Sequence, residues 1–320
     1  MTIHALTGTE QPTQVIQRPR LLARVMGWEL RRFAASRLFW FQAFGFWGFL
    51  LLIVWALHAS DQTGTIAGNV QLSAYVAGTS AGGLLRTLPT YLIILALLLP
   101  FITADGVTRD VNRRTYELLM TTALPTRTYV LGRYVAVLLI GLGLALLLFV
   151  SILGMGGLLH LTDSTYPLPQ PDAVLLLWVG MVVSATILVS SVGFAMSTLW
   201  PRLSMLIKAV IMVGWLVGAL VLPLSFHDAT SLPGWYVDWD PTSGITALGL
   251  LPAYQVGLSH SITSEAQLLQ LVLSVENKMP DLAGWFAPHL GLSGLSLLLV
   301  LVAAFTFKRS RATLSYWTWL

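Results

Sequence analysis

Residues 105–133 read DGVTRDVNRRTYELLMTTALPTRTYVLGR, an arginine-rich segment that lies between two long apolar runs. Its central residues 116–120, YELLM, are amphipathic and favour a short helix. Pro125 ends that helix, because the residue before a proline is disfavoured in the α region. Thr126 is placed to cap a second helix that begins at Arg127. The segment therefore predicts a short polar helix that connects two apolar helices.

The composition defines the class of protein to which these apolar helices belong. Hydrophobic residues make up 56% of the chain and charged residues 10%, whereas soluble domains are about 25% charged. Only helices and closed barrels satisfy their backbone hydrogen bonds in lipid. The apolar runs do not alternate with polar residues as barrel strands do. The chain is therefore expected to be an all-α polytopic membrane protein.

A membrane-spanning helix needs about 20 apolar residues, and six runs reach that length. They cover residues 38–57, 84–103, 129–153, 173–199, 203–224 and 290–307. We therefore predict a single six-span transmembrane domain over residues 38–320, with a polar loop at 104–128 and a long loop at 225–289. Residues 1–37 precede this domain as a polar tail and an amphipathic helix.

The distribution of lysine and arginine predicts the orientation of the spans. All of the 18 cations except Arg86 and Lys278 fall on the side of the membrane that holds both chain ends. Because positively charged loops stay in the cytoplasm, we expect both termini and loop 104–128 to be cytoplasmic. This bias also explains the basic composition without a nucleic-acid partner.

Two segments outside the spans have patterns of their own. Residues 19–37 combine one apolar face with several arginines, a pattern typical of a basic helix on the membrane surface; the alternative is a cytoplasmic extension of the first span. The outer loop 225–289 contains short apolar pieces and aromatic residues suited to the membrane interface. We expect short helices there that rest on the outer leaflet or re-enter it.

Motifs for catalysis, nucleotide binding or metal binding are not found. The chain has no cysteine, no glycine-rich loop that ends in Lys-Ser or Lys-Thr, and no paired histidine spacing. No acidic residue or arginine falls near the middle of a span, and Lys208 lies about one turn from an inner end, where it can snorkel. Proton-driven pumps generally need buried ionisable relays, so we expect neither catalytic residues nor proton coupling.

Gly214 and Gly218 form a small-xxx-small pair in the fifth span. Such pairs let two helices approach closely. The pair predicts either helix packing within one subunit or a dimer face.

The order of residues in segment 105–133 is more specific than the positive charge that any cytoplasmic loop is expected to carry. It places a basic residue before Thr-x-Glu-Leu-Leu, and a threonine, a proline and Leu-Gly-Arg follow. The residues are Arg113, Thr115, Glu117, Leu118, Leu119, Thr121, Pro125, Leu131, Gly132 and Arg133. This pattern resembles the loop after the second span in ATP-binding-cassette transporter permeases of the type-2 exporter superfamily. The chain departs from it in the order Arg109-Asp110 and in Arg114, where the family usually has glycine.

The resemblance implies a permease subunit in the cell membrane that exports its substrate and is not itself an enzyme. Separate ATPase subunits would bind ATP and Mg, and a second permease copy or a paralogue would complete the transporter beside membrane lipid. The implied ATPase-coupling residues are Arg109, Arg113, Arg114, Glu117, Leu118, Leu119 and Pro125. One alternative is a membrane scaffold or anchor that recruits a cytoplasmic partner without transport. Another is an intramembrane enzyme that acts on lipid, which requires histidines and aspartates of the outer side to converge.

Overall fold

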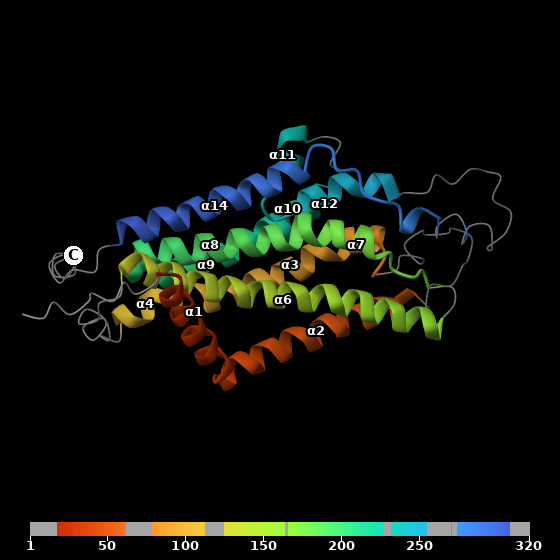
Figure 1. Ribbon diagram of the computed structural model, residues 1–320. Coiled ribbons are helices and arrows are strands. Elements are labelled where there is room, and N and C mark those ends of the chain that lie inside the picture. The colour runs from red at the N-terminus through yellow and green to blue at the C-terminus, as the bar shows by residue number, and fades with distance from the viewer. Residues whose placement is uncertain are drawn as a thin grey trace, which may run out of the picture.

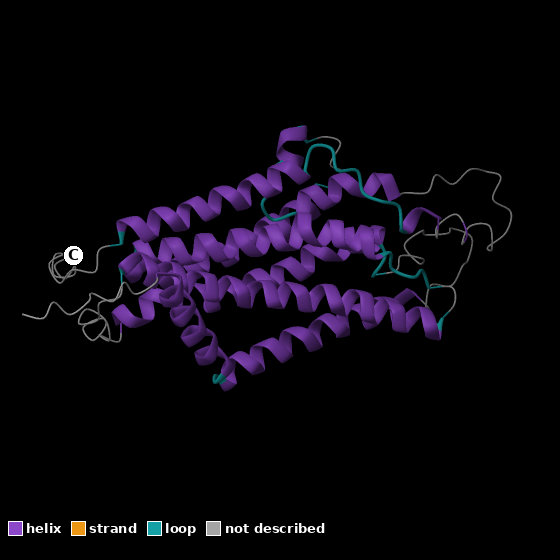
Figure 2. Ribbon diagram, viewed as in Figure 1, coloured by secondary structure: helices purple, strands orange, loops and turns teal. Residues whose placement is uncertain are grey.

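The computed structural model describes residues 18–61, 78–112, 125–163, 166–226, 232–254, 270 and 274–307. These residues form helices and loops, and no strand occurs among them (Figure 2). Six helices are long and apolar enough to span a membrane. They are Arg37–Ala56, Ala81–Thr103, Thr126–Thr162, Pro171–Leu199, Pro201–Ser225 and Phe286–Thr306. The prediction of six spans is confirmed, and the chain is a multi-pass membrane protein.

Figure 1 shows these spans side by side as one elongated bundle, with α1 and α2 meeting at an elbow from which α1 runs toward the start of α6. The helices of the bundle are α1 (Arg18–Ala34), α2 (Arg37–Asp61), α3 (Ala81–Thr103), α4 (Asp105–Asn112), α6 (Thr126–Thr162), α7 (Pro171–Leu177), α8 (Ser184–Leu199), α9 (Ser204–Leu216) and α14 (Phe286–Thr306). The short helices are α10 (Leu222–Ser225), α11 (Gly234–Asp238) and α12 (Gly244–Leu250). Segments Pro201–Leu203 and Leu251–Tyr254 are 3₁₀ turns.

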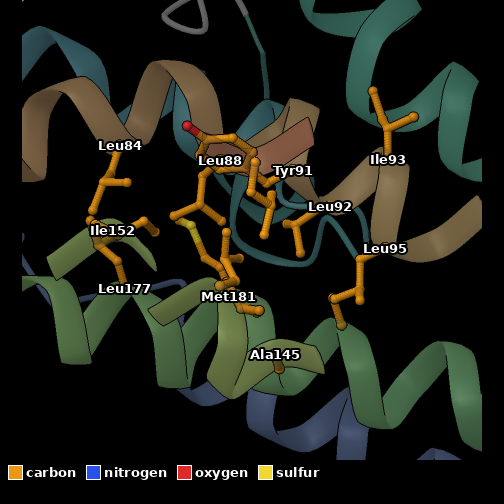
Figure 3. Packing of buried hydrophobic residues seen from close by; sticks show 14 of the residues in the cluster. Leu84, Leu88, Tyr91, Leu92, Ile93, Leu95, Ala145, Ile152, Leu177 and Met181 are labelled. Carbon is orange, nitrogen blue, oxygen red and sulfur yellow. The ribbon is translucent and has the colours of Figure 1, made fainter. Parts of the chain in front are cut away.

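The centre of the bundle is α3, which packs against α6 and the fourth span. Figure 3 shows Leu88 and Leu92 of α3 pointing toward Met181 of the fourth span. Apolar burial gives little driving force between helices in lipid, so close side-chain packing has to supply it. The spans that contain α2 and α9 instead expose most of their side chains at the edge of the bundle.

We call the end of the bundle that holds Asp105 and Pro125 the inner end and the end that holds Asp240 and Glu276 the outer end, after the predicted orientation. Two spans contain π-helical turns in the outer half. Trp178–Val183 and Val217–Val221 are π-helical segments in the fourth and fifth spans. Each contains a glycine against which an outer-loop side chain packs: the Trp285 ring lies against Gly180, and Thr242 lies against Gly218. A Cβ atom at either glycine would overlap its neighbour. The outer loop is therefore seated on the two sites where the helices are irregular.

The third span is longer than its apolar core requires. Helix α6 has 37 residues, which at 1.5 Å per residue is about 55 Å and exceeds the roughly 30 Å of lipid hydrocarbon. The prediction that Thr126 caps this helix is wrong. Pro125 is the N-cap residue, with extended backbone (φ −61°, ψ 133°), and Thr126 is already helical.

Candidate functional site

Helix α4 begins the polar segment that the sequence singled out, and an ion pair fastens it to the fifth span. Lys208 Nζ lies 2.7 Å from Asp105 Oδ1 and 5.4 Å from the centroid of the Phe101 ring. The Lys208 side chain is 6% exposed, and the Asp105 side chain 41%. The charge of Lys208, which lies in an apolar span, is therefore paired with a carboxylate.

The opposite face of α4 is buried in the bundle. Val107 belongs to an apolar cluster with Tyr129 and Val130 of α6, Phe194 of α8 and Val300 of α14, together with other residues of these helices. The Thr108 hydroxyl donates to the Ala104 carbonyl at 2.7 Å, which satisfies a buried polar group. Helix α4 is therefore part of the packed bundle at its inner end (Figure 1).

The start of α6 is fastened by a second charged contact, to α1. Arg133 and Glu29 are both fully buried, and Arg133 Nε lies 4.0 Å from Glu29 Oε2. Arg32 also pairs with Glu29, at 2.5 Å. The Arg133 guanidinium carbon lies 5.2 Å from the Trp28 ring centroid and 4.7 Å from that of Tyr129. Both rings lie close to the guanidinium group, and their π systems stabilise its positive charge through cation–π interactions.

Gly132 makes this close approach of α1 possible. A Cβ atom at position 132 would lie 3.0 Å from Val25 Cβ and 3.4 Å from the Leu22 carbonyl oxygen. Helices α1 and α6 are extensively in contact. The Leu-Gly-Arg sequence at 131–133 thus seats α1 on α6. Helix α1 is separated from the first span by a break at Ala35 and Ser36 and packs on the third span. Its placement on the membrane surface or as a cytoplasmic extension of the first span stays a prediction.

The structure describes two of the seven predicted coupling residues. Arg109 is half-buried in α4, and Pro125 is exposed at the N-cap of α6. The other five, Arg113, Arg114, Glu117, Leu118 and Leu119, lie outside the described residues, as does the predicted helix at 116–120. Arg127, just after Pro125, places its guanidinium carbon 4.1 Å from the Phe305 ring centroid.

The glycine pair of the fifth span divides into two different environments. Gly218 packs against Thr242 of the same chain, whereas a Cβ atom at Gly214 would have no neighbour within 4 Å. Packing within one subunit therefore accounts for Gly218. Gly214 keeps an open face, and its place in a dimer face stays a prediction.

A second cluster of polar side chains lies at the outer end and caps α12. Asp240 is buried, and its Oδ1 accepts hydrogen bonds from the backbone and hydroxyl of Thr242 at 2.9 and 2.7 Å. Its Oδ2 accepts from the backbone N–H of Ile245 at 2.7 Å and of Thr246 at 3.4 Å. The carboxylate thus satisfies N–H groups at the start of α12, where a helix has unpaired donors.

Ser243 and His289 meet beside this cap. The Ser243 Oγ lies 3.3 Å from His289 Nε2, and His289 Nδ1 lies 2.8 Å from the Trp285 carbonyl oxygen. Ser243 has φ +62°, a left-handed backbone that only a few per cent of non-glycine residues adopt. Both side chains are buried, and Asp240 is occupied by α12. These groups therefore fasten the outer loop to α14, and we assign them no catalytic role.

The outer end of α3 holds a third buried carboxylate. The Ser80 hydroxyl donates to Glu276 Oε2, and the carboxylate faces the first turn of α3, with Arg86 nearby. Burial raises the pKa of Glu276 above its ordinary value, although Ser80, Arg86 and the Gly83 N–H favour the charged form. The contact ties the short helical segment at 274–276 to the second span.

Sequence reasoning missed all three carboxylate contacts. Glu29, Asp240 and Glu276 lie far from their partners along the chain or within polar loops, where their charge alone has no distinctive pattern. Among the described residues, no three His, Cys, Asp or Glu side chains come together as a metal-binding group.

The fold and these contacts define a multi-pass α-helical membrane protein with a fastened junction at each end. Comparison with known proteins gave no match to a family model, to a curated protein or to a solved structure.

Proposed function

We propose that this chain is the membrane subunit of an ATP-driven exporter in the cell membrane. Separate ATPase subunits dock on the loop between the second and third spans and supply its energy. The observation that carries the proposal is that the helices on both sides of this loop are held in the bundle by buried contacts. On one side, Asp105 binds Lys208 of the fifth span. On the other, Arg133 and Gly132 hold α1 against the third span.

Fastened flanks are what a force-receiving loop requires. A push on a loop with loose ends is absorbed by the loop, whereas a push on packed helices moves the helices as rigid bodies. Helix α4 contacts α3, α6 and α8, and Lys208 adds α9. A displacement of residues 113–124 would therefore reach four spans through α4, which is about two helical turns long.

The spans themselves support an external energy source. Across the six spans the only carboxylate is Asp172, in the first turn of the fourth span, and the two histidines, His160 and His289, lie within about one turn of a span end. Proton-driven transporters use carboxylates and histidines deep in the membrane as relays. Work delivered by ATPase subunits at the loop needs no such relay. The cytoplasmic placement of both termini belongs to the same proposal and rests on the bias of positive charge.

A second copy of the chain, or a paralogue, completes the transporter in this proposal. The spans with α2 and α9 have the least covered faces of the bundle, including Phe41, Met205 and Val213. In the assembly these faces contact lipid and the second subunit.

Copurification tests the proposal. We expect the full-length chain to copurify with an ATPase subunit and to support ATP-dependent export in vesicles. Glu117→Lys combined with Leu118→Asp should abolish both, since the change reverses one charge and places a second in an apolar contact. Arg202→Glu, a charge reversal at the inner end outside the loop, is the matched control and should retain both.

Two results decide against this function. Retention of ATPase binding and export by the Glu117→Lys, Leu118→Asp variant shows that the loop is not the docking site. Copurification of a partner without ATPase activity, together with the absence of ATP-dependent transport, favours the scaffold alternative.

A further inference from the structure

Helix α1 presents two faces with different environments. Glu29 is buried against α6, while Arg24, Trp28 and Arg31 are exposed. The spacing of these three residues, four and then three positions, places them along one stripe of the helix surface. The Trp28 ring borders α6, with its centroid 5.2 Å from the Arg133 guanidinium carbon, and is still 51% exposed. Arg24 and Arg31 are exposed on either side of Trp28 along the helix.

The arginines around this stripe differ in what they pair with. Arg32 and Arg133 both contact Glu29. Arg24, Arg31 and Arg37 are exposed, and within the described ranges none of them forms an ion pair with a carboxylate. Three positive charges at one end of α2 are thus available to a negatively charged ligand from outside the chain.

The elbow between α1 and α2 determines where the three exposed arginines lie relative to the first span. The Trp40 indole donates to the Ala34 carbonyl at 2.8 Å, and the Ser36 hydroxyl accepts from the Phe39 N–H at 3.3 Å. These bonds lie where α1 ends and the first span begins, and the two helices meet there at an elbow (Figure 1). Phe41 follows in the first span and is 77% exposed. Because the first span begins at Arg37, directly after α1, we expect the stripe at the headgroup level of the membrane.

We propose that the face formed by Arg24, Trp28, Arg31 and Arg37 binds the phosphate headgroups of anionic phospholipids. Guanidinium groups bind phosphate oxygens in paired hydrogen bonds. An indole prefers the headgroup level, where one side is apolar and the other wet. Basic residues beside a span attract anionic lipid. The inference requires only that the chain spans a membrane, and it is independent of ATP-driven transport.

Lipid retention by the purified full-length protein tests this face. Native mass spectrometry after exposure to mixed phosphatidylglycerol and phosphatidylcholine should show bound phosphatidylglycerol in excess. The variant Arg24→Gln, Arg31→Gln, Arg37→Gln should reduce this preference by about fivefold for each charge removed. Arg127→Gln with Arg202→Gln is the control, since both arginines are exposed at the same end of the bundle, and it should keep the preference.

Fluorescence locates the bound lipid. Emission from vesicles with brominated phosphatidylglycerol, compared between the wild-type protein and Trp28→Phe, should reveal a quenched Trp28 signal that weakens in the triple variant. Equal thermal unfolding of the triple variant and the wild type will show that the fold is kept. The proposal is overturned if the triple variant retains the wild-type lipid preference, if brominated phosphatidylcholine quenches Trp28 equally, or if inorganic phosphate displaces the lipid.

Discussion

The inner and outer ends of the bundle are fastened by different kinds of contact. At the inner end, Glu29 with Arg133 and Asp105 with Lys208 join separate helices through full charges of opposite sign. At the outer end, Asp240 binds backbone N–H groups and a hydroxyl in its own loop. A charge pair between two helices can open while both helices stay folded, whereas a capping bond is lost together with its helix end. The inner end is therefore the better place for controlled motion.

The buried pair between α1 and α6 should give the largest effect. We expect Glu29→Leu to lower the free energy of unfolding by about 3–5 kcal/mol, because Arg133 is left as a buried charge without its carboxylate. The double variant Glu29→Leu, Arg133→Leu removes both charges and should recover a large part of the loss. Thermal unfolding in detergent measures both variants.

This cycle also tests the contrast between the two ends. If the double variant is as unstable as Glu29→Leu alone, the loss comes from packing of α1 and not from the charge. The contact between Glu29 and Arg133 would then stabilise the protein through packing and not through charge pairing. Arg31→Leu, a change at an exposed position of the same helix, is the control and should stay within about 0.5 kcal/mol of the wild type.

The two glycines of the fifth span should give the next largest difference. Gly218→Leu places a side chain into Thr242 of the seated outer loop, and overpacking of this kind costs about 1–3 kcal/mol. Gly214→Leu meets open space in the subunit and should leave the stability of the subunit unchanged. If Gly214 lies in a dimer face, its variant will instead lower the fraction of dimer in cross-linking and light scattering.

Measurements of unfolding and of oligomeric state thus distinguish packing within the subunit at Gly218 from a dimer contact at Gly214. A stable Gly218→Leu protein would show that the outer loop is not seated on the π-helical segment as described. An unchanged dimer fraction in Gly214→Leu would remove Gly214 from the dimer face.

The spans were predictable because their signal is local. About 20 consecutive apolar residues suffice to mark a span, so α3 was predicted to within three residues of its observed start, Ala81. The helix Asp105–Asn112 depends instead on tertiary contacts. Val107 stabilises α4 only because Phe194 and Val300 are present to cover it.

The partners of single charges were not predictable for the same reason. Lys208 satisfies the snorkelling rule equally well with water, lipid phosphate or a carboxylate, and only the fold brings Asp105 to it. Gly132 and Arg133 were identified through a resemblance that concerns the loop. Their contact with α1 involves residues more than 100 positions away, which no local pattern indicates.

The pair Asp105–Lys208 should show a smaller and unequal effect. Asp105→Asn leaves Lys208 buried without its carboxylate and should cost about 1–2 kcal/mol. Lys208→Met leaves a partly exposed aspartate and should cost less than about 1 kcal/mol. If the loop receives force as proposed, both variants will keep ATPase binding and lose part of the ATP-dependent export. Equal stability losses would mean that Lys208 is hydrated and that α4 is not fastened by this charge.

The smallest effect is expected at Glu276 and should depend on pH. Its folded-state pKa is raised by burial, so the folded protein holds the proton more tightly than the unfolded chain. The stabilisation is fully present below the unfolded pKa, near 4.5, and is lost as the pH rises through the raised folded value. Glu276→Gln keeps an acceptor for the Ser80 hydroxyl and cannot ionise. The difference in Tm between this variant and the wild type should therefore grow in favour of the variant as the pH rises above 4.5; a difference that is constant with pH would show that the Glu276 carboxylate is hydrated and does not form the buried contact with Ser80.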